Sequence, residues 1–269
     1  MLLNVDQRKK TEIEYYDKRA KDWKGDLTAK KKQGDFEGFS PIDLSSYQFC
    51  YELLKKNCKG KKVLDYGCGN GVHSVVPIIW GAEKVIGIDL SEASLRIARE
   101  KIQKEGLGDK VEFMAMDCEK LAFPDNSFDI IFDGGTFSSL DLNLALPELA
   151  RVLKPDGLLL GIETFGHNPI TNLKRKINKI SGKRTGWAAE HILRMENLKK
   201  AKDYFNNIEV YYFHLISWLA FPFLGLPGSK ILLKTLEGLD RFFLTIPFLR
   251  KYSFKVVFVF SWPRKYKNV

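Results

Sequence analysis

Short apolar runs alternate along this chain with segments of helical periodicity. Runs of β-branched and aliphatic residues bounded by turn residues predict buried strands, and apolar residues at helical spacing, as in 92–105, predict amphipathic helices. Strands that alternate with helices in this way predict a parallel α/β sheet with right-handed crossovers. The strands expected on this basis cover residues 63–64, 85–89, 111–117, 125–133 and 158–164, followed by about 207–216 and 254–262.

A glycine-rich turn follows the first of these strands. Its spacing is D-x-G-x-G-x-G, from Asp65 through Gly67 and Gly69 to Gly71. This spacing differs from the G-x-G-x-x-G fingerprint of dinucleotide-binding folds. Glycines allow the backbone to turn sharply and to approach a ligand closely, and ligands of such sheets bind beyond the carboxyl ends of the strands. The turn therefore predicts a ligand site.

Three successive strands end in a carboxylate. Asp65 closes the first strand, Asp89 closes the second and Asp117 closes the third. Because the carboxyl ends of parallel strands meet at one edge of the sheet, we expect the three acids to share one cleft. An acid after the second strand suits the two hydroxyl groups of a ribose.

At these residues the chain resembles the class I S-adenosylmethionine (SAM)-dependent methyltransferases, and in particular their type 11 small-molecule branch. The resemblance extends over about 45–165 and includes the later markers 125–133 and 153–157. It implies that the glycine turn holds the methionine part of SAM, that the second acid binds the ribose and that the third faces the adenine. The cofactor-binding residues that it implies are Asp65, Gly67, Cys68, Gly69, Gly71, Asp89, Leu90, Asp117, Cys118 and Asp133.

The same resemblance implies the architecture. We expect a Rossmann-like sheet of seven strands, with the seventh strand antiparallel between the fifth and sixth. An N-terminal helical lid would span 1–58, the SAM-binding core 59–166, and a substrate cap with the last two strands 167–269. An insertion between strands six and seven is longer than is usual in this family.

Candidate catalytic residues follow the fifth strand. An alcohol or phenol acceptor needs a base near neutrality, and histidine is the natural source. His167 lies just beyond that strand, and the neighbours Glu190 and His191 lie further on. The spacing between these residues is similar to a pattern in one uncharacterised group of type 11 methyltransferases. Where that group has a His-His pair, this chain has Ser138-Ser139.

Charge is distributed unevenly over the 269 residues. The net charge is +10, yet 171–184 and 241–269 together hold thirteen Lys or Arg and no acid. The aromatic and aliphatic insertion over 217–250 lies between them. It is either an extra helical layer that buries its own apolar face or a surface for a lipophilic substrate or an anionic membrane. No recognisable nucleic-acid module accompanies the basic residues.

The remaining composition is that of an intracellular globular protein. The four cysteines show no metal-ligand spacing, which favours reduced thiols in the cytoplasm. The sequence therefore predicts a cytoplasmic SAM-dependent methyltransferase that can associate with a membrane. Its acceptor would be a small molecule, with methylation at an oxygen of a lipid-linked, glycan or secondary-metabolite intermediate. Two alternatives stay open: a nicotinamide-dependent oxidoreductase, and a non-catalytic SAM-binding scaffold recruited to a membrane. The sequence predicts no oligomeric state.

Overall fold

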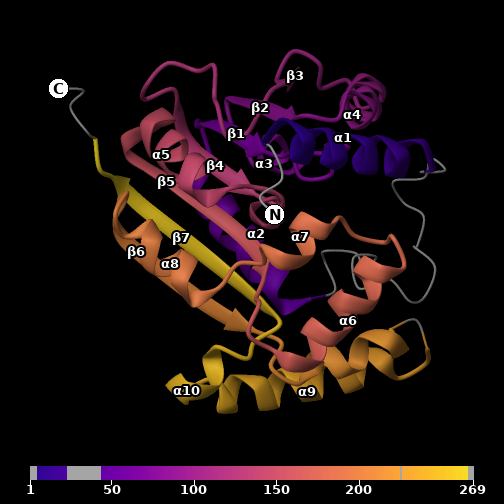
Figure 1. Ribbon diagram of the computed structural model, residues 1–269. Coiled ribbons are helices and arrows are strands. Elements are labelled where there is room, and N and C mark those ends of the chain that lie inside the picture. The colour runs from indigo at the N-terminus through magenta and orange to yellow at the C-terminus, as the bar shows by residue number, and fades with distance from the viewer. Residues whose placement is uncertain (1–4, 23–43, 225, 266–269) are drawn as a thin grey trace.

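The computed structural model describes residues 5–22, 44–224 and 226–265 (Figure 1). Residues 23–43, part of the N-terminal unit expected from the sequence, lie outside the described residues. The helices are α1 (Val5–Asp22), α2 (Ser45–Asn57), α3 (Val75–Ile79), α4 (Glu92–Lys104), η2 (Phe137–Ser139), α5 (Leu142–Val152), α6 (Pro169–Ile180), α7 (Gly186–Glu190), α8 (Met195–Ala201), η3 (Ser217–Phe223), α9 (Ser229–Phe243) and α10 (Pro247–Arg250). The strands are β1 (Lys62–Tyr66), β2 (Lys84–Asp89), β3 (Val111–Ala115), β4 (Phe128–Asp133), β5 (Leu153–Thr164), β6 (Phe205–Phe213) and β7 (Lys255–Pro263).

The seven strands form one sheet in the order β3-β2-β1-β4-β5-β7-β6. The pairs among the first five strands are parallel, whereas β7 is antiparallel to both β5 and β6. This arrangement confirms the fold class predicted from the sequence. Strand β6 ends earlier than residue 216, because His214 has a positive φ of 61° and turns its ring toward the hydroxyls of Ser46 and Ser217.

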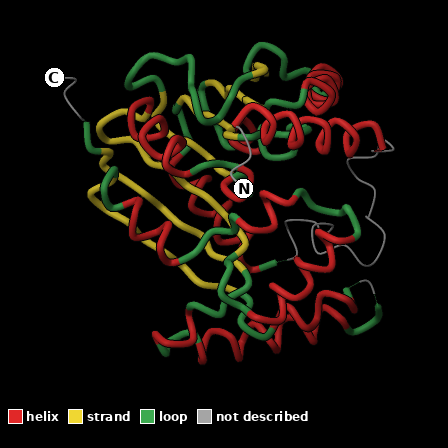
Figure 2. Tube along the Cα trace, viewed as in Figure 1, coloured by secondary structure: helices red, strands yellow, loops and turns green. Residues whose placement is uncertain are grey.

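Helices cover both faces of the sheet, which explains why the central parallel strands are mainly apolar and buried. On one face α2, α3 and α4 pack over a core that includes Leu54, Leu95 and Val85. On the other face α5 and α8 pack over a core that includes Leu149 and Phe258. Figure 2 shows the strands in yellow with red helices on both sides.

Helix α3 begins later than the apolar run 72–80 suggests. It starts at Val75, so Pro77 lies in its first turn. A proline is tolerated there because the first amides of a helix have no intrahelical partner. The glycine turn is thereby followed by turn structure before the helix, and no kink arises.

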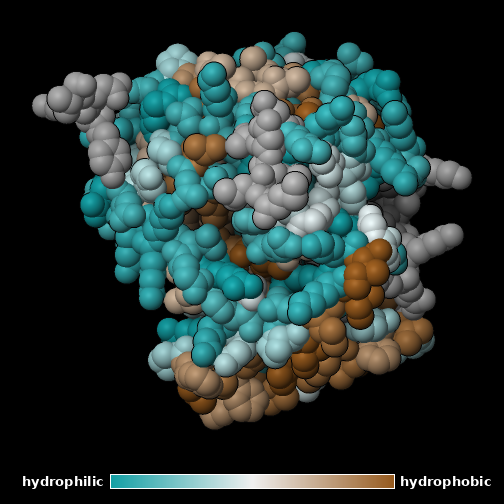
Figure 3. All heavy atoms as spheres, in the orientation of Figure 1, coloured by the Kyte–Doolittle hydropathy of each residue, from teal (hydrophilic) through white to brown (hydrophobic). Residues whose placement is uncertain are grey.

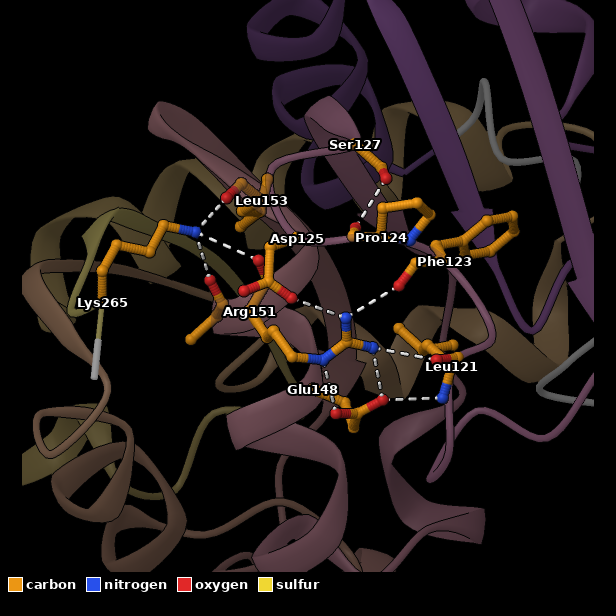
Figure 4. A network of polar contacts seen from close by, with 10 residues as sticks. Leu121, Phe123, Pro124, Asp125, Ser127, Glu148, Arg151, Leu153 and Lys265 are labelled. Carbon is orange, nitrogen blue, oxygen red and sulfur yellow. Dashed lines mark hydrogen bonds and ion pairs between the residues drawn. The ribbon is translucent and has the colours of Figure 1, made fainter. Parts of the chain in front are cut away.

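Arg151 in α5 ties the connection between β3 and β4 to the core (Figure 4). Its guanidinium donates hydrogen bonds to the carbonyl oxygens of Phe123 (2.7 Å) and Leu121 (2.9 Å), and it pairs with Asp125 and Glu148. The planar guanidinium has five N–H donors, which allows one side chain to hold so many acceptors. Arg151 therefore secures the chain just before β4.

The insertion between β6 and β7 contains η3, α9 and α10. It packs on the start of α2 through a small third cluster that includes Leu44, Phe221 and Leu233. In Figure 1 these elements lie at the bottom of the molecule, next to α6. None of the helices in the described part of the chain has both the length and the apolar character needed to cross a bilayer.

Candidate active site

The glycine turn lies between β1 and α3 at the carboxyl edge of the sheet. All three of its glycines have positive φ, but they serve different purposes. A Cβ on Gly67 would lie 2.2 Å from Thr136 Oγ1, and a Cβ on Gly71 would lie 3.0 Å from Ala98 Cβ. A Cβ on Gly69 would meet no atom of the described residues within 4 Å. Gly67 and Gly71 are therefore required by close packing, and Gly69 borders open space where a ligand can approach.

Asp65 in β1 stabilises the glycine turn from inside the protein. Its side chain is buried in the penultimate position of β1 and accepts a 2.5 Å hydrogen bond from the hydroxyl of Ser74. Burial raises the pKa of Asp65 to about 7, and the negative charge of Asp89 acts in the same direction. The carboxyl group thus connects the two ends of the glycine turn.

Asp89 is the last residue of β2 and touches the glycine turn directly. It accepts hydrogen bonds from the backbone N–H of Gly69 (2.9 Å) and of Ser91 (2.8 Å). Burial raises its pKa, although these backbone bonds act in the opposite direction. The Ser91 hydroxyl accepts from the backbone N–H of Ser94 at the start of α4 and donates to Asp17 in α1. Leu90, between these residues, is half-buried.

Asp117 lies two residues beyond β3, which ends at Ala115. It accepts a hydrogen bond from the backbone N–H of Glu119 (2.9 Å) and forms an ion pair with Lys9 of α1. Next to it, the buried Cys118 accepts a 2.5 Å hydrogen bond from the Tyr66 hydroxyl at its carbonyl oxygen.

The surroundings of the Cys118 thiol indicate that the strand-end acids lie near one another. Burial raises the pKa of this thiol, and the charges of Asp89, Asp117 and Asp133 raise it further. Coulomb interactions of this kind require short separations. The structure therefore brings the strand-end acids together around one region. Cys68, in the glycine turn, is buried as well, and its Sγ lies close to Gly87 of β2.

Helix α1 closes over this region. Arg8 pairs with Glu119 at 2.5 Å, and its guanidinium lies 4.5 Å from the centre of the Trp187 ring in α7. The Tyr15 hydroxyl donates to the carbonyl oxygen of Lys183. The helix thus connects the strand-end acids with the segment after β5, as a lid would.

A second pair of carboxyl groups lies at the tips of β4 and β5. Asp133 pairs in register with Gly161, so Glu163 lies two residues further toward the same edge. Asp133 Oδ1 accepts from the backbone N–H of Thr136 (2.8 Å), and Glu163 Oε2 accepts from that of Thr164 (3.1 Å). Asp133 Oδ2 and Glu163 Oε1 are buried and have no hydrogen-bond partner among the residues that the structure describes.

Burial raises the pKa of both groups. For Asp133 the neighbouring Glu163 raises it further, whereas Lys255 and Arg184 act against the rise at Glu163. Burial and the repulsion between the two charges therefore make it costly for both carboxyl groups to ionise together. Glu163 is not among the residues predicted from the sequence. A single acid within the apolar run of β5 was the signal that could have identified it.

His73 lies against the tip of β4. A Cβ on Gly134 would lie 2.7 Å from its ring. Its Nδ1 forms a 2.7 Å hydrogen bond with the Tyr51 hydroxyl, and burial lowers the pKa of His73 to about 4. The ring is therefore neutral at physiological pH. Its role is packing between α2 and the glycine turn.

The histidines and acid predicted as catalytic lie in two other places. His167 Nε2 accepts a 3.1 Å hydrogen bond from the backbone N–H of Met195, and burial lowers its pKa. Glu190 and His191 are exposed at the end of α7. Glu190 pairs with Lys179 at 2.5 Å, and the His191 ring stacks on Trp187 with 3.5 Å between the ring centres. These hydrogen bonds, ion pairs and the stacking contact all join residues of the cap, and the catalytic role of the three residues stays a prediction.

The residues present fit the cofactor that the sequence predicts. Gly69 leaves open space beside Asp89, whose carboxylate faces the turn, and Asp117 and Cys118 lie around the same region. An adenosyl group has hydroxyls and an amine that such carboxylates bind through charge-assisted hydrogen bonds. Asp65 is different, because its carboxyl group is engaged with Ser74 inside the protein.

Comparisons with known proteins agree with this geometry. A protein family described as Methyltransferase domain matches residues 63–157. The demethylmenaquinone methyltransferase of Bacteroides fragilis is 36% identical over 115 residues, which cover 40% of this chain and 45% of that protein. The sterol 24-C-methyltransferase of Gibberella zeae is 38% identical over 100 residues, which cover 37% of this chain and 26% of that protein. The chain thus spans less than half the length of these relatives.

Among solved structures, the fold is similar to that of the geranyl diphosphate C-methyltransferase from Streptomyces coelicolor in complex with Mg²⁺, geranyl diphosphate and S-adenosyl-L-homocysteine. The TM-score is 0.62 at 16% sequence identity, and the match covers 95% of this chain and 97% of the other. This likeness concerns the fold. Together with the sequence matches, it confirms the family resemblance: the chain carries a class I S-adenosylmethionine-dependent methyltransferase domain.

Proposed function

We propose that this protein transfers a methyl group from SAM to a small lipophilic acceptor and releases S-adenosylhomocysteine. The observation that carries the proposal is the contact between Asp89 and Gly69, because it joins the acid after β2 to the glycine that borders open space. When bound, SAM supplies an electrophilic methyl group. The protein then has to bind the cofactor and the acceptor, orient them toward each other and exclude water from the site.

In this proposal Asp89 accepts hydrogen bonds from the ribose hydroxyls, and Asp117 accepts one from the adenine amino group. Lys9 occupies the Asp117 carboxylate in the structure, so α1 has to release this ion pair or share it when the adenine is bound. Gly67 and Gly71 keep the turn in shape for the methionine part. Asp65 acts through Ser74 and is a positioning residue.

Asp133 and Glu163 are the proposed base. Their unpartnered oxygens are buried at the tips of β4 and β5, next to Thr136, which itself packs on Gly67. Because the pKa of each is raised, the pair holds a proton more readily than ordinary carboxylates do. An acceptor hydroxyl at this position can donate its hydrogen bond to the ionised member and lose its proton there. His167 is the second candidate for this role, since it was predicted from the sequence.

Two observations support a lipophilic acceptor. The relatives named above act, by their names, on a quinone, a sterol and a prenyl diphosphate. In addition, the cap after β5 is rich in apolar side chains. We propose an acidic hydroxyl, such as a phenol or enol, methylated at oxygen. Carbon is the second candidate, because two of the relatives are named C-methyltransferases.

Isothermal titration with SAM and S-adenosylhomocysteine tests the cofactor half. Loss of the charge-assisted hydrogen bonds from Asp89 should weaken binding by about tenfold to a hundredfold in Asp89→Ala. The exposed acid Asp156 supplies the matched control, and Asp156→Ala should bind as the wild type does. A folded wild-type protein that binds neither ligand refutes the proposal, as does equal affinity in Asp89→Ala.

Turnover is tested with SAM labelled at the methyl group and a cellular lipid extract. Removal of a general base typically lowers the rate by about 10² to 10⁴-fold. Glu163→Gln should therefore lose methyl transfer and keep SAM affinity, while the exposed strand residue variant Glu209→Gln should keep both. If His167→Ala loses turnover and Glu163→Gln does not, the base is His167. No labelled product with any extract favours the non-catalytic scaffold, and enhanced NADH fluorescence favours the oxidoreductase.

A further inference from the structure

An apolar face runs along the outside of the cap. Helix α6 has four of its large aliphatic side chains exposed at helical spacing, from Ile170 to Ile180, which is 87% exposed. Helix α9 packs Leu233 and Leu236 against the small third core and leaves four large apolar side chains exposed: Ile231, Leu232, Leu239 and Phe242. This outer apolar face consists of Ile170, Leu173, Ile177, Ile180, Leu219, Phe223, Leu226, Ile231, Leu232, Leu239, Phe242, Ile246 and Phe248.

The face is continuous in space. In Figure 3 a brown band extends over the position of α9 at the bottom of the molecule and rises toward α6 at the right. Soluble monomers rarely expose contiguous apolar patches of more than a few hundred Å², and larger patches mark a protein or membrane contact. The insertion therefore buries a small core of its own and also exposes many of its large apolar side chains.

Basic residues border the face on both helices. In α6, Lys174 and Lys176 lie on the two sides of the aliphatic stripe by helical spacing. In α9, Lys230, Lys234 and Arg241 lie along one edge of the apolar stripe, by the same spacing.

The two acidic side chains of α9 point into the protein, away from the outer apolar face. Glu237 and Asp240 are both buried. Glu237 accepts a 3.0 Å hydrogen bond from the backbone N–H of Ser45, and Asp240 accepts a 2.8 Å hydrogen bond from that of Ile216. The outward charge of α9 is therefore entirely positive.

We propose that this face docks the protein onto an anionic lipid bilayer, with the aliphatic and aromatic side chains inserted at the interface and the lysines among the headgroups. An apolar stripe bordered by Lys and Arg is the pattern of helices that lie in the plane of a membrane. A second copy of the chain fits less well, because a symmetric contact would bring the two basic borders together. Docking is a property of the cap and does not depend on the proposed methyl transfer.

Vesicle co-sedimentation tests the proposal with two vesicle compositions: phosphatidylcholine alone, and phosphatidylcholine with roughly a third phosphatidylserine. The wild type should bind the anionic vesicles and bind the neutral ones much more weakly. In the double variant Ile231→Glu/Phe242→Glu, two exposed side chains become charged without disturbing the core, and binding should fall by at least about tenfold. Lys176→Gln/Lys234→Gln should lose about fivefold per lysine at low salt.

Ile79→Glu is the matched control. Ile79 is 70% exposed, as Phe242 is 69% exposed, but it lies in α3 at the other end of the molecule. Its vesicle binding should equal that of the wild type. Absence of wild-type binding, equal binding to both vesicle types, or full binding by Ile231→Glu/Phe242→Glu overturns the proposal. A lipid-free dimer in sedimentation velocity that Phe242→Glu dissociates also overturns it, in favour of an interface between copies. SAM titration of the same variants separates these outcomes from a failure of the cofactor site.

Discussion

Replacing Asp65 with asparagine should change how the stability of this protein depends on pH. The buried carboxyl group has a pKa of about 7 in the folded protein, against about 3.9 in an unfolded chain. Between these two values the folded state binds a proton that the unfolded state does not bind. Stability therefore falls as pH rises through this window, since folding has to take up that proton or bury the charge. Asparagine keeps an acceptor for the Ser74 hydroxyl and has no proton to lose.

The size of the effect follows from the difference between the two pKa values. Each pKa unit corresponds to about 1.36 kcal/mol, so the wild-type carboxyl group lowers the free energy of unfolding by about 1.5 kcal/mol at pH 5 and by about 4 kcal/mol at pH 8. The free energy of unfolding of Asp65→Asn, minus that of the wild type, should thus rise by about 2.5 kcal/mol between those two pH values. Any cost of the buried amide group is the same at both.

Urea unfolding near pH 5 and near pH 8 measures this difference. Asp129→Asn is the control, because the pKa of Asp129 is shifted downward whereas that of Asp65 is shifted upward. Although burial alone would raise the pKa of Asp129, hydrogen bonds from Lys154 and from the backbone N–H of Lys62 lower it. That carboxylate stays ionised in both states over the whole window, so its variant should show a difference that is independent of pH. A flat difference for Asp65→Asn as well would refute the reasoning.

Two further variants test the packing around the site. Gly67→Ala and Gly69→Ala both place a side chain at positive φ, at a cost of about 1–2 kcal/mol. Gly67→Ala should lose about 1–3 kcal/mol more because its Cβ would collide with Thr136. In thermal unfolding, equal losses for the two alanines would contradict the proposed contact. Arg151→Ala should lose about 2–3 kcal/mol in urea unfolding, since it leaves several acceptors of the β3–β4 connection without their donor. Arg151→Lys should restore only part of this loss, because an ammonium group cannot donate the paired, coplanar hydrogen bonds of a guanidinium. Full restoration by lysine would argue against the network in Figure 4.

Local sequence pattern was sufficient for the sheet and for the cofactor region. Buried parallel strands are mainly apolar, and the glycine turn needs glycine wherever φ is positive. Both features are therefore visible without a structure. The acids Asp89 and Asp117 could be found for a related reason: Asp89 is the last residue of β2, and Asp117 lies two residues beyond the end of β3.

Other parts of the site depended on contacts between residues far apart in the chain. The pairing of Glu163 with Asp133 exists only once β4 lies beside β5. Lys9 and Arg8 reach Asp117 and Glu119 across more than a hundred residues. The exposed positions of Glu190 and His191 also follow from the packing of α7 against α1 and α6, which no local pattern reports.

By itself the sequence determined the class of the sheet, the order of its elements and the family, because periodicity and the glycine spacing are local properties of the chain. Only the tertiary structure decided which face of α9 is buried and which is exposed. A helix rich in apolar residues can bury its stripe in a core or present it to a lipid, and the sequence pattern is the same in both cases. In this structure the small core around Leu233 occupies only one side of α9. The wider apolar stripe of the helix, which includes Phe242, therefore stays exposed.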